Sequence, residues 1–525
     1  MYHNSYEKMA VPEHIRKIER PKGTVVGDER NGVYPVREKL SSKSWVDENG
    51  KRHRPSKNGK VVGHIVNGTF VPLENRVETV SVCDVDIKDW GEYCLSNCLN
   101  SDILEDLKQV YEEGDALRLY VMAMLRSVRR GLTDRLMMRT YQESFISEVY
   151  PGLNLGKNQV CTFLRNVGRA YNKTVAFMRN RISGCGADDR LIIDGSIKQD
   201  HSKVNTLSAV SRKTCHTKHR DMSIMYCYGM RSREPLCCKA YPGNMVDMRA
   251  VEDFIEENRI TEGILIADKG FPVESVESEI RKHDGLHFLL PMRRDRPEIR
   301  KYSMLAFDSC LPDARGISCK KIGAIWKGHK VWFYSFRDPQ IAKDEEVLYL
   351  SGKDSSQVDA RELASRRREF GTLVFISDLN LTCGEVSKIY DERWMIELMF
   401  RFERDILEMD DTREHSDYTA IASEFVDYLA AIMSARAYKY LDSKNILEKC
   451  TYGDAMHRLA RFKMVRSADD GEWRMNRTAL TDAEFASEVG ILVKPVVPYV
   501  VKKRGRPKGS KDTRPRRKKS APQSE

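Results

Sequence analysis

Four short apolar segments, set off by polar and turn residues, limit the folds open to this chain. They are RLIIDGS (190–196), GILIADKGF (263–271), LHFLLPMR (286–293) and GTLVFISD (371–378). Continuous apolar runs of this length are typical of strands that are buried on both faces. Helical patterns separate the segments along the chain. The sequence is therefore predicted to be α/β, with a mixed sheet flanked by helices.

Changes in composition along the 525 residues predict several regions. They are a small polar, β-rich N-terminal segment (1–83), a helical domain (84–186), an α/β core in two parts (187–292 and 373–445) with a β-rich insertion between them (293–372), a C-terminal helical region (446–501) and a disordered basic tail (502–525). The helical domain has a basic face that includes Arg165, Arg169 and Lys173, and we interpret it as a DNA-binding domain. An ordinary helical domain with solvated cations explains that face equally well.

The bulk composition indicates a soluble protein of a reducing compartment. The chain has no run of eighteen apolar residues, and its first residues, MYHNSYEKMAVPEH, lack the apolar centre of a signal peptide. We therefore expect no contact with a membrane. Thirteen cysteines, an odd number spread over a long chain, do not resemble a disulfide framework. A cytoplasmic location is the simpler interpretation.

The positive charge of the chain is concentrated in its tail. Residues 502–525 contain eleven Lys or Arg and two acids, so they carry +9 of the net charge of +11. The segment KKRGRPKGS resembles an AT-hook, an extended motif that would place Arg504 and Arg506 in the minor groove of A·T-rich DNA. The alternative is a disordered tail that only increases solubility.

The segment YDERWMIELMFRFERDIL (390–407) predicts a helix that is apolar around most of its circumference. Its polar residues fall within one stripe roughly 80° wide. The stripe consists of Tyr390, Arg393, Glu397, Arg401 and Arg404. A solvated face with i,i+4 ion pairs would produce the same stripe. The helix alone does not decide between an ion-paired surface and a functional site.

Two further acids point to a functional site. Asp194 and Asp268 are predicted to end two buried strands, and Glu397 would be the third carboxylate at one edge of the sheet. Three converging carboxylates repel one another unless cations lie between them. Oxygen ligands suit Mg²⁺ or Mn²⁺, and two such ions can promote displacement at a phosphodiester. Lys198, close behind Asp194, could contact DNA or belong to a surface turn.

With these residues in place, the chain resembles the DDE transposases of the class named after insertion sequence four, which have an RNase H-like fold. That class has a tyrosine, an arginine, the catalytic glutamate and a lysine at fixed spacing on one helix. Tyr390, Arg393 and Glu397 match the first three, and Arg404 replaces the lysine. Arginine binds a phosphate as a planar fork rather than as a point charge. The aspartates match Asp194 and Asp268.

The resemblance implies an enzyme that cleaves DNA and transfers strands at the ends of an insertion sequence. Asp194, Asp268 and Glu397 would be its catalytic residues and would bind two Mg²⁺ or Mn²⁺ ions. Its partners would be double-stranded DNA, both the terminal inverted repeats and the target, and a second copy of the chain in the DNA complex. Its location would be the cytoplasm of a prokaryote, at the nucleoid. Two alternatives stay open: a non-mobile, metal-dependent nuclease of the same fold, and a catalytically inactive DNA-binding protein.

Several residues are expected to contact DNA in such an enzyme. They are Tyr390, Arg393, Arg401, Arg404, Trp326, Trp332, Arg504 and Arg506. The two tryptophans lie in GAIWKGHKVWFYSFRD, which predicts a β-hairpin turning at Lys327-Gly328. An indole ring can stack on a flipped base, but two tryptophans in a hairpin are also common core aromatics.

Overall fold

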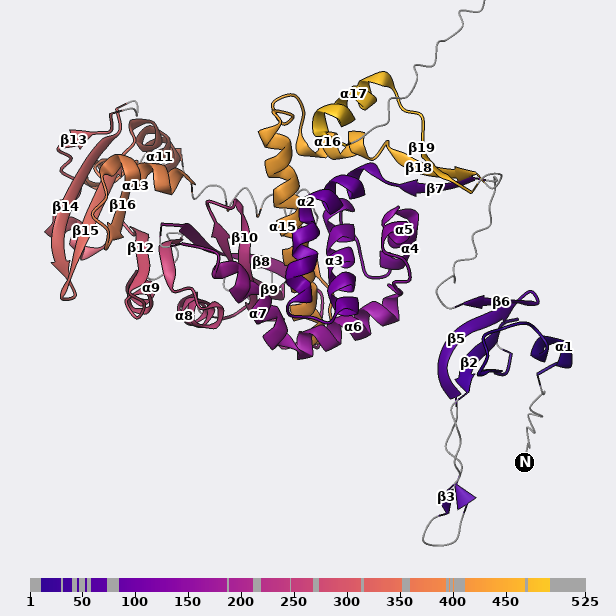
Figure 1. Ribbon diagram of the computed structural model, residues 1–525. Coiled ribbons are helices and arrows are strands. Elements are labelled where there is room, and N and C mark those ends of the chain that lie inside the picture. Colours follow the sequence, from indigo (N-terminus) through magenta and orange to yellow (C-terminus); the bar gives the residue numbers. More distant parts are fainter. Residues whose placement is uncertain are drawn as a thin grey trace, which may run out of the picture.

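The structure is a computed structural model (Figure 1). It describes residues 11–29, 32–39, 45–46, 52–53, 58–72, 85–186, 188–210, 219–245, 247–267, 273–312, 316–351, 359–392, 396, 400, 411–467 and 471–491. Among these residues, no helix is both long enough and apolar enough to cross a membrane.

Within the described residues, ten strands form one large sheet. Its order is β10-β9-β8-β11-β12-β16-β15-β14-β13, and β17 pairs with β8. The strands are β8 (Arg190–Asp200), β9 (Asp221–Gly229), β10 (Glu234–Pro242), β11 (Glu262–Ala267), β12 (Gly285–Met292), β13 (Ser309–Cys310), β14 (Ser318–Trp326), β15 (His329–Arg337), β16 (Thr372–Ser377) and β17 (Asp411–Thr412).

The directions of these strands follow from their connections. β8, β11 and β12 are mutually parallel, because helices α8 (Asp247–Asn258) and α9 (Val273–Ile280) provide the crossovers that parallel strands need. β9 and β10 are antiparallel neighbours on the other side of β8. A strand order of this kind, with a meander of three strands followed by two parallel strands, is the RNase H-like arrangement. The predicted mixed α/β fold is confirmed.

The insertion extends the sheet instead of forming a separate domain. β15 pairs along its length with β16, so β14 and β13 continue the same sheet outward. The predicted hairpin is confirmed, with Trp326 opposite His329. Lys327 and Gly328 have φ of 50° and 84°, as a two-residue hairpin turn requires. Three helices complete this part: α10 (Pro297–Lys301), α11 (Pro339–Ser351) and α12 (Ala360–Arg367).

Helix α13 (Cys383–Glu392) returns the chain from the insertion to the core. A capping box, which the spacing of Thr382 and Glu385 in the sequence indicates, holds its start: the N–H of Glu385 donates to Thr382 Oγ1 (3.2 Å), and the N–H of Thr382 donates to Glu385 Oε2 (2.7 Å). α13 ends at Glu392, and of residues 393–410 the structure describes Ile396 and Phe400, both helical.

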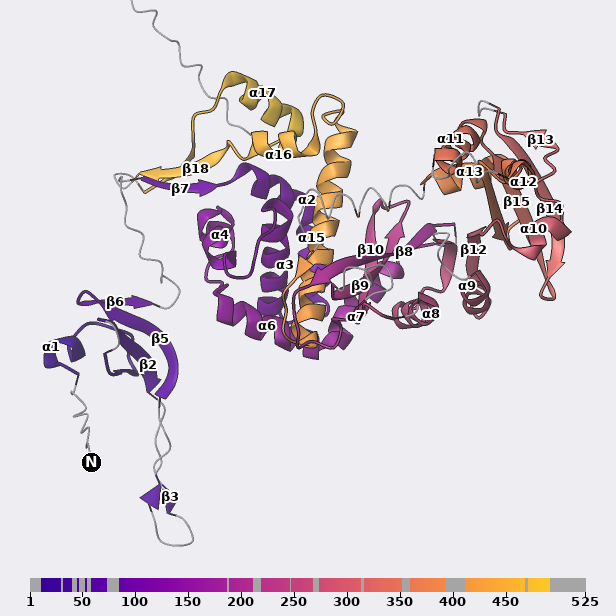
Figure 2. The same cartoon turned by 180° about the vertical axis from the view of Figure 1, so that it is seen from behind.

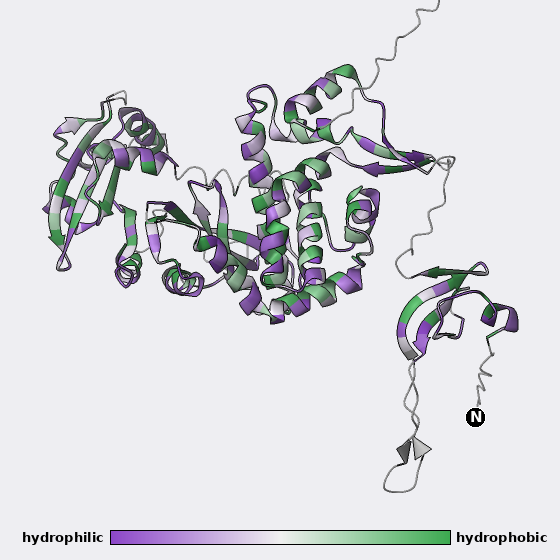
Figure 3. Ribbon diagram, viewed as in Figure 1, coloured by the Kyte–Doolittle hydropathy of each residue, from purple (hydrophilic) through white to green (hydrophobic). Residues whose placement is uncertain are grey.

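A helical layer packs beside β8, β9 and β10. Its helices are α2 (Gly91–Lys108), α3 (Glu113–Val128), α4 (Met137–Glu143), α5 (Ile146–Val149), α6 (Lys157–Arg169), α7 (Tyr171–Ile182) and α15 (Asp417–Ser443). α15 runs through the layer alongside α2 and α3, and α6 runs across one end of these three helices in both views (Figures 1 and 2). The residues with which α3 and α15 face their neighbours are largely hydrophobic (Figure 3).

The C-terminal region is not purely helical, contrary to the prediction. It contains α16 (Tyr452–Leu459), α17 (Leu480–Val489) and the hairpin strands β18 (Lys463–Ser467) and β19 (Trp473–Met475). β18 pairs with β7 (Val85–Asp89), which lies just before α2 and more than 370 residues earlier in the chain than β18. The sequence does not indicate the hairpin, because short polar strands have little pattern of their own and β7, the third strand of this sheet, lies far away in the sequence.

The described part of the N-terminal segment contains a small sheet. β1 (Thr24–Val26), β2 (Tyr34–Lys39), β5 (Asn58–Val66) and β6 (Thr69–Pro72) form a four-stranded sheet. A second pair, β3 (Trp45–Val46) and β4 (Arg52–His53), lies between β2 and β5 in the sequence, and helix α1 (Glu13–Arg16) precedes the sheet. Ile15, Val36 and Ile65 are the buried centre of a small separate core.

The crossing of α6 and α15 predicts a stability effect. A Cβ atom added at Gly168 would lie 1.9 Å from the backbone oxygen of Tyr418, which a side-chain rearrangement cannot relieve. We expect Gly168→Ala to lower the free energy of unfolding by about 1–3 kcal/mol, measured by denaturant titration. Gly114→Ala is the matched control, because a Cβ at Gly114 has nothing within 4 Å and alanine favours the helix. Equal effects of the two substitutions would contradict this packing.

Candidate active site

Asp194 lies on β8 next to the last described pair of that strand with its parallel neighbour. That pair is Ile193 opposite Ala267 on β11. Ala267 is the last described residue of β11, and Asp268 lies outside the described residues. The prediction that β8 ends at Asp194 is wrong, because the antiparallel partner β9 continues to hydrogen-bond β8 as far as Gln199. Asp194 is therefore a residue within a strand.

The side chain of Asp194 is half-buried and locally held. Its Oδ1 accepts a hydrogen bond from the N–H of Gly195 at 2.8 Å. Tyr226 on β9 is directly opposite Asp194. Directly opposed residues of antiparallel strands project to the same face of the sheet. Asp194 and Tyr226 therefore mark one face of the sheet.

The segment that follows α13 packs on that same face. The rings of Phe400 and Tyr226 lie 5.7 Å apart between centroids, with an interplanar angle of 64°. Ile396, one helical turn earlier, is completely buried. Residues four apart lie on one side of a helix, so Ile396 and Phe400 indicate the side that faces the sheet. The predicted residues Arg393, Glu397, Arg401 and Arg404 of this segment lie outside the described residues.

Tyr390 is the one residue of the predicted helix stripe that the structure describes. Its ring meets the ring of Phe375 on β16 edge to face, with 4.5 Å between centroids. Phe375 is buried, so this contact fixes the ring of Tyr390 against the sheet.

The two tryptophans of the insertion have different surroundings. Trp326 is only 6% exposed, and its indole N–H donates to Glu298 Oε1 at 3.0 Å. Of the two interpretations, this burial supports a core aromatic at Trp326. Trp332 is half-buried, with Lys330 Nζ 5.2 Å from the ring centroid, and base stacking by Trp332 stays a prediction. Arg504 and Arg506 lie outside the described residues.

Lys198 lies on the same face as Asp194 but belongs to a buried charge cluster. Side chains four apart on a strand point the same way. Lys198 Nζ lies 2.6 Å from Glu424 Oε2 and 2.9 Å from Asp427 Oδ2, both on α15. Lys198 is 4% exposed, so a surface turn does not describe it. The sequence around Lys198 does not indicate these ion pairs, because Glu424 and Asp427 are more than 220 residues away.

Arg126 extends the cluster into the helical domain. Its guanidinium lies 2.8 Å from Asp427 Oδ1 and 2.9 Å from Asp134 Oδ1, and it also donates to the backbone oxygen of Ser423 at 3.0 Å. The cluster therefore joins α3, α15 and β8, the strand that carries Asp194. One signal in the sequence could have indicated it: Glu424 and Asp427 are acids three apart in an otherwise apolar helix, SEFVDYLAAIM.

The cluster contains three acids and two cations, and this imbalance affects protonation. Burial raises the pKa of Glu424 to about 7, although Lys198 opposes the rise, and the nearby Asp427 adds to it. Burial also acts upward on the pKa of Asp427, but Lys198 and Arg126 outweigh burial and hold that pKa below its usual value. Glu424 is therefore the member of the cluster that takes up a proton first.

A cavity of about 810 Å³ opens beside the cluster. Arg126, Glu424 and Asp427 line its inner wall, and Lys157 and Arg135 line it nearer to solvent. The cavity thus lies between the start of α6 and the segment that connects the predicted Glu397 helix to α15.

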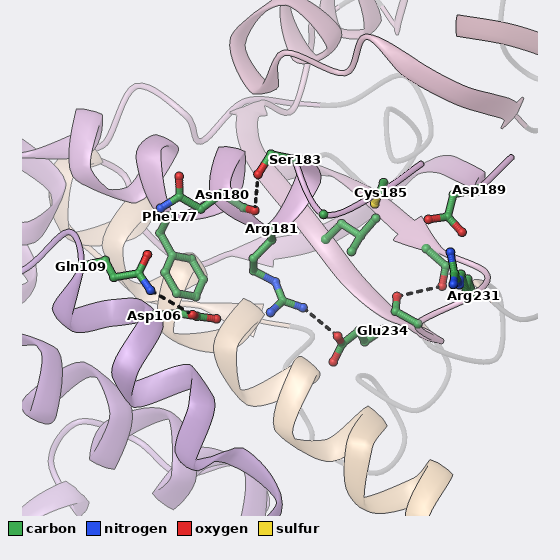
Figure 4. A pocket seen from close by; sticks show the side chains of 14 residues that line it. Asp106, Gln109, Phe177, Asn180, Arg181, Ser183, Cys185, Asp189, Arg231 and Glu234 are labelled. Atoms are coloured by element: carbon green, nitrogen blue, oxygen red, sulfur yellow. Dashed lines mark hydrogen bonds and ion pairs between the residues drawn. The ribbon is translucent and has the colours of Figure 1, made fainter. Parts of the chain in front are cut away.

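A second cavity, of about 730 Å³, opens at the other end of β8 (Figure 4). Arg181 reaches across it to Glu234, with 3.0 Å between the charged groups. Asp189, which precedes β8, lines it as well. None of the predicted site residues lines this cavity, so it is separate from the Asp194 face.

The structure describes only one of the three carboxylates that are predicted to bind metal ions. Asp194 is described, whereas Asp268 and Glu397 are not. Within the described part of the chain, no group of three or more His, Cys, Asp and Glu side chains could hold a metal ion. Three carboxylates are nevertheless the donor chemistry that Mg²⁺ or Mn²⁺ prefers, so the predicted residue types fit these ions.

Comparison with known proteins bears on this site. Residues 186–417 match the family model described as a transposase DDE domain. Asp194, Asp268 and Glu397 all lie within the match, which covers less than half of the chain. This region is therefore similar in sequence to a transposase DDE domain.

One solved structure with a similar backbone is a piggyBac transposase synaptic complex with hairpin DNA, determined by cryo-EM. The similarity has a TM-score of 0.38 at 10% sequence identity and covers 70% of this chain and 79% of that chain. No curated protein matches the sequence.

The pKa of Glu424 predicts how stability depends on pH. Because the folded pKa, about 7, exceeds the usual 4.5, the folded chain binds this proton more tightly than the unfolded chain does. This contribution to stability is complete below pH 4.5 and is lost as the pH rises to about 7. We expect Glu424→Gln to make the decline shallower, measured as the unfolding midpoint between pH 4.5 and 8. Part of the decline should remain, because burial also raises the pKa of Glu92 to about 7. The exposed Glu448→Gln should keep the decline of the parent chain, and a parallel decline in Glu424→Gln would refute the assignment.

Proposed function

We propose that this protein is a transposase that cleaves DNA strands at the ends of an insertion sequence and joins them to target DNA. Asp194, Asp268 and Glu397 would be its catalytic carboxylates, as the resemblance to the insertion-sequence-four class implies. The family match over residues 186–417 supports the general class. The assignment of the three catalytic carboxylates rests on the strand pairing and packing around Asp194.

The observation that carries the proposal is the register of β8 and β11. Ile193 is paired with Ala267, and one peptide bond links each of them to an acid, Asp194 and Asp268. Consecutive Cα atoms are about 3.8 Å apart and neighbouring strands about 4.8 Å apart. Two carboxylates that follow a paired position on parallel strands are within reach of a shared ion.

The third acid is supported by the packing of Phe400. Glu397 precedes Phe400 by three residues, slightly less than one helical turn. Phe400 contacts Tyr226, which is directly opposite Asp194. The described residues of the segment therefore support a position of Glu397 near the strand pair that carries Asp194.

Two Mg²⁺ or Mn²⁺ ions held by these carboxylates would supply Lewis acidity to the attacking and leaving oxygens of the phosphodiester. Arg393, Arg401 and Arg404 would bind DNA phosphates beside the carboxylates. Tyr390 would position the start of this helix, because its ring is packed on Phe375. Pairing two DNA ends for joining would require at least a dimer in the DNA complex.

Asp194→Asn should abolish cleavage if this proposal is correct. Changing an outer-shell partner of a metal ligand already lowers metal affinity or activity about 10- to 100-fold, so loss of a ligand should lower Mg²⁺-dependent nicking by at least about 100-fold. The assay would be nicking of a plasmid that carries the DNA flanking this gene. Asp295→Asn, the same change at an exposed aspartate outside the predicted site, should leave nicking unchanged.

Convergence of the three acids has an independent readout. Fe²⁺ bound in place of Mg²⁺, with ascorbate and peroxide, should cut the polypeptide close to residues 194, 268 and 397. Cutting near only one of them would refute the shared site. Nicking without joining of a supplied 3′ end would favour the nuclease alternative, and no metal-dependent nicking at all would favour the DNA-binding alternative.

The basic tail predicts a salt dependence of DNA binding. Each phosphate contact by Lys or Arg adds about 0.9 to the slope of log affinity against log salt concentration. Residues 502–525 carry eleven cations, so their deletion should reduce the slope by several units, measured by fluorescence anisotropy with a random-sequence duplex. An unchanged slope would mean that the folded body makes the phosphate contacts.

The AT-hook assignment makes a narrower prediction for the same assay. Arg504→Lys with Arg506→Lys keeps the charge of the tail but removes the guanidinium groups. This variant should keep the slope and lose any preference for A·T-rich duplexes over G·C-rich ones. A preference that survives the change would leave the tail as a nonspecific polycation.

A further inference from the structure

A long segment of the helical domain contains no acidic residue. Between Val149 and Ala187 the chain has no Asp or Glu, although at its overall frequency of 77 acids in 525 residues about six would be expected. This segment contains α6 and α7, with Lys157, Arg165, Arg169 and Lys173 among its cations. Within the described residues, none of these four cations forms an ion pair, so no described acid neutralises their charge.

Helix α6 separates its residues sharply into two faces. The buried face consists of Val160, Phe163, Leu164, Val167 and Gly168. The exposed face consists of Asn158, Thr162, Arg165, Asn166 and Arg169. The exposed residues recur at three- and four-residue spacing and so form one stripe along the helix. Arginine and asparagine are the side chains that make bidentate hydrogen bonds to the edges of guanine and adenine in the major groove.

The size and place of α6 suit a groove. Its thirteen residues make a helix about 20 Å long, and a helix with side chains is about as wide as the major groove of B-DNA. α6 runs across one end of α2, α3 and α15 instead of lying within the layer (Figures 1 and 2). Its polar stripe is therefore the outer surface of that end.

Cations at both ends of α6 are placed to bind the sugar–phosphate backbone. Lys157 starts the helix, and Arg135, from the loop before α4, lines the same cavity. At the other end, Arg169 lies over the ring of Tyr418 (5.8 Å), and Lys173 lies over the ring of Tyr111 (5.7 Å). Contacts to phosphates on both sides of a groove fix the register of a reading helix.

The buried face connects α6 to the Asp194 strand. Gly168 brings the backbone of α6 against the backbone of Tyr418 at the start of α15. Further along α15, Glu424 and Asp427 hold Lys198 on β8. Two tight contacts thus fix the exposed stripe of α6 relative to Asp194. Such a connection would set the distance along the DNA between the base pairs that α6 contacts and the phosphodiester bond that is cleaved at Asp194.

We propose that α6 is the helix that enters the major groove of double-stranded DNA, with Asn158, Arg165 and Asn166 contacting base edges and Lys157, Arg135 and Lys173 contacting phosphates. The proposal rests on the proposed function for the identity of that DNA, the ends of the element. It assigns recognition of the end sequence to the folded body and leaves electrostatic attraction and any A·T preference to the tail.

The test is selection of binding sites by the full-length chain from a library of random-sequence duplexes, in EDTA so that no cleavage takes place. The parent chain should enrich one sequence. Arg165→Ala should weaken binding to that duplex by about 10- to 100-fold and relax the preference at one base pair. Asn158→Ala should relax the preference at a neighbouring position. Arg135→Ala should weaken binding to all duplexes alike and reduce the salt slope by about one.

The control is Arg361→Ala, an exposed arginine on α12 that should leave the enriched sequence unchanged. All of these substitutions are at exposed positions, and their unfolding midpoints should match that of the parent. If Arg165→Ala and Asn158→Ala enrich the parent sequence with unchanged affinity, the proposal is overturned. Enrichment of no sequence, or preference for RNA over DNA duplexes, would overturn it as well.

Failure of this proposal and failure of the proposed function give different results. Asp194→Asn should bind and select DNA like the parent, because binding in EDTA needs no metal site. If substitutions on α6 change the selected sequence but neither the parent chain nor any variant cleaves DNA, only the transposase assignment is rejected. If Mg²⁺-dependent nicking depends on Asp194 but substitutions on α6 do not change the selected sequence, only the proposal that α6 reads DNA is rejected.

Discussion

The strand β8 is the constraint on which the rest of the structure depends. Over its eleven residues it pairs with β9 on one side and with β11 and then β17 on the other. Buried backbone groups must be hydrogen-bonded, so three partners with defined registers leave β8 a single position. Alternation along the strand then puts Asp194 and Lys198 on the same face. The candidate catalytic acid and the anchor of α15 are thus set by one strand.

The charge cluster around Lys198 shows how two layers are held in a fixed relation. Burying three acids with two cations is costly, and good geometry only partly offsets the loss of hydration. Apolar residues of similar volume would pack as well without that cost, but they would tolerate sliding of α15 along the sheet. Ion pairs at 2.6–2.9 Å permit one alignment of α15 with β8 and α3. We interpret the cluster as a device for alignment.

The long helix α15 carries this alignment across the molecule. It contacts α6, α3 and α2 in the helical layer and β10 in the sheet. β17, immediately before it, pairs with the end of β8. The chain that leaves the predicted Glu397 helix is therefore fixed within a few residues, both by strand pairing and by the buried cluster. The DNA-binding stripe proposed on α6 and the cleavage site proposed at Asp194 would therefore be held at a fixed separation by α15.

Several elements could be predicted because their signals are local. The apolar strands, the Thr382–Glu385 capping box and the turn at Lys327-Gly328 each depend on a few adjacent residues, and the structure contains them all. The length of β8, the hairpin β18–β19 and the burial of Lys198 were missed. The length of β8 depends on pairing with β9, the sheet that contains the hairpin also contains the distant β7, and Lys198 is buried by acids on α15. No pattern within one segment reports such partners.

The sequence by itself determined the mixed α/β class, the spacing of the polar stripe around Glu397 and the concentration of charge in the tail, because periodicity and composition are properties of consecutive residues. Only the tertiary structure decided that Asp194 lies within a strand opposite Tyr226, and that Lys198 is buried instead of exposed. The physical reason is that burial and strand register arise from contacts between segments, and a side chain such as lysine is stable in either setting once its partners are known.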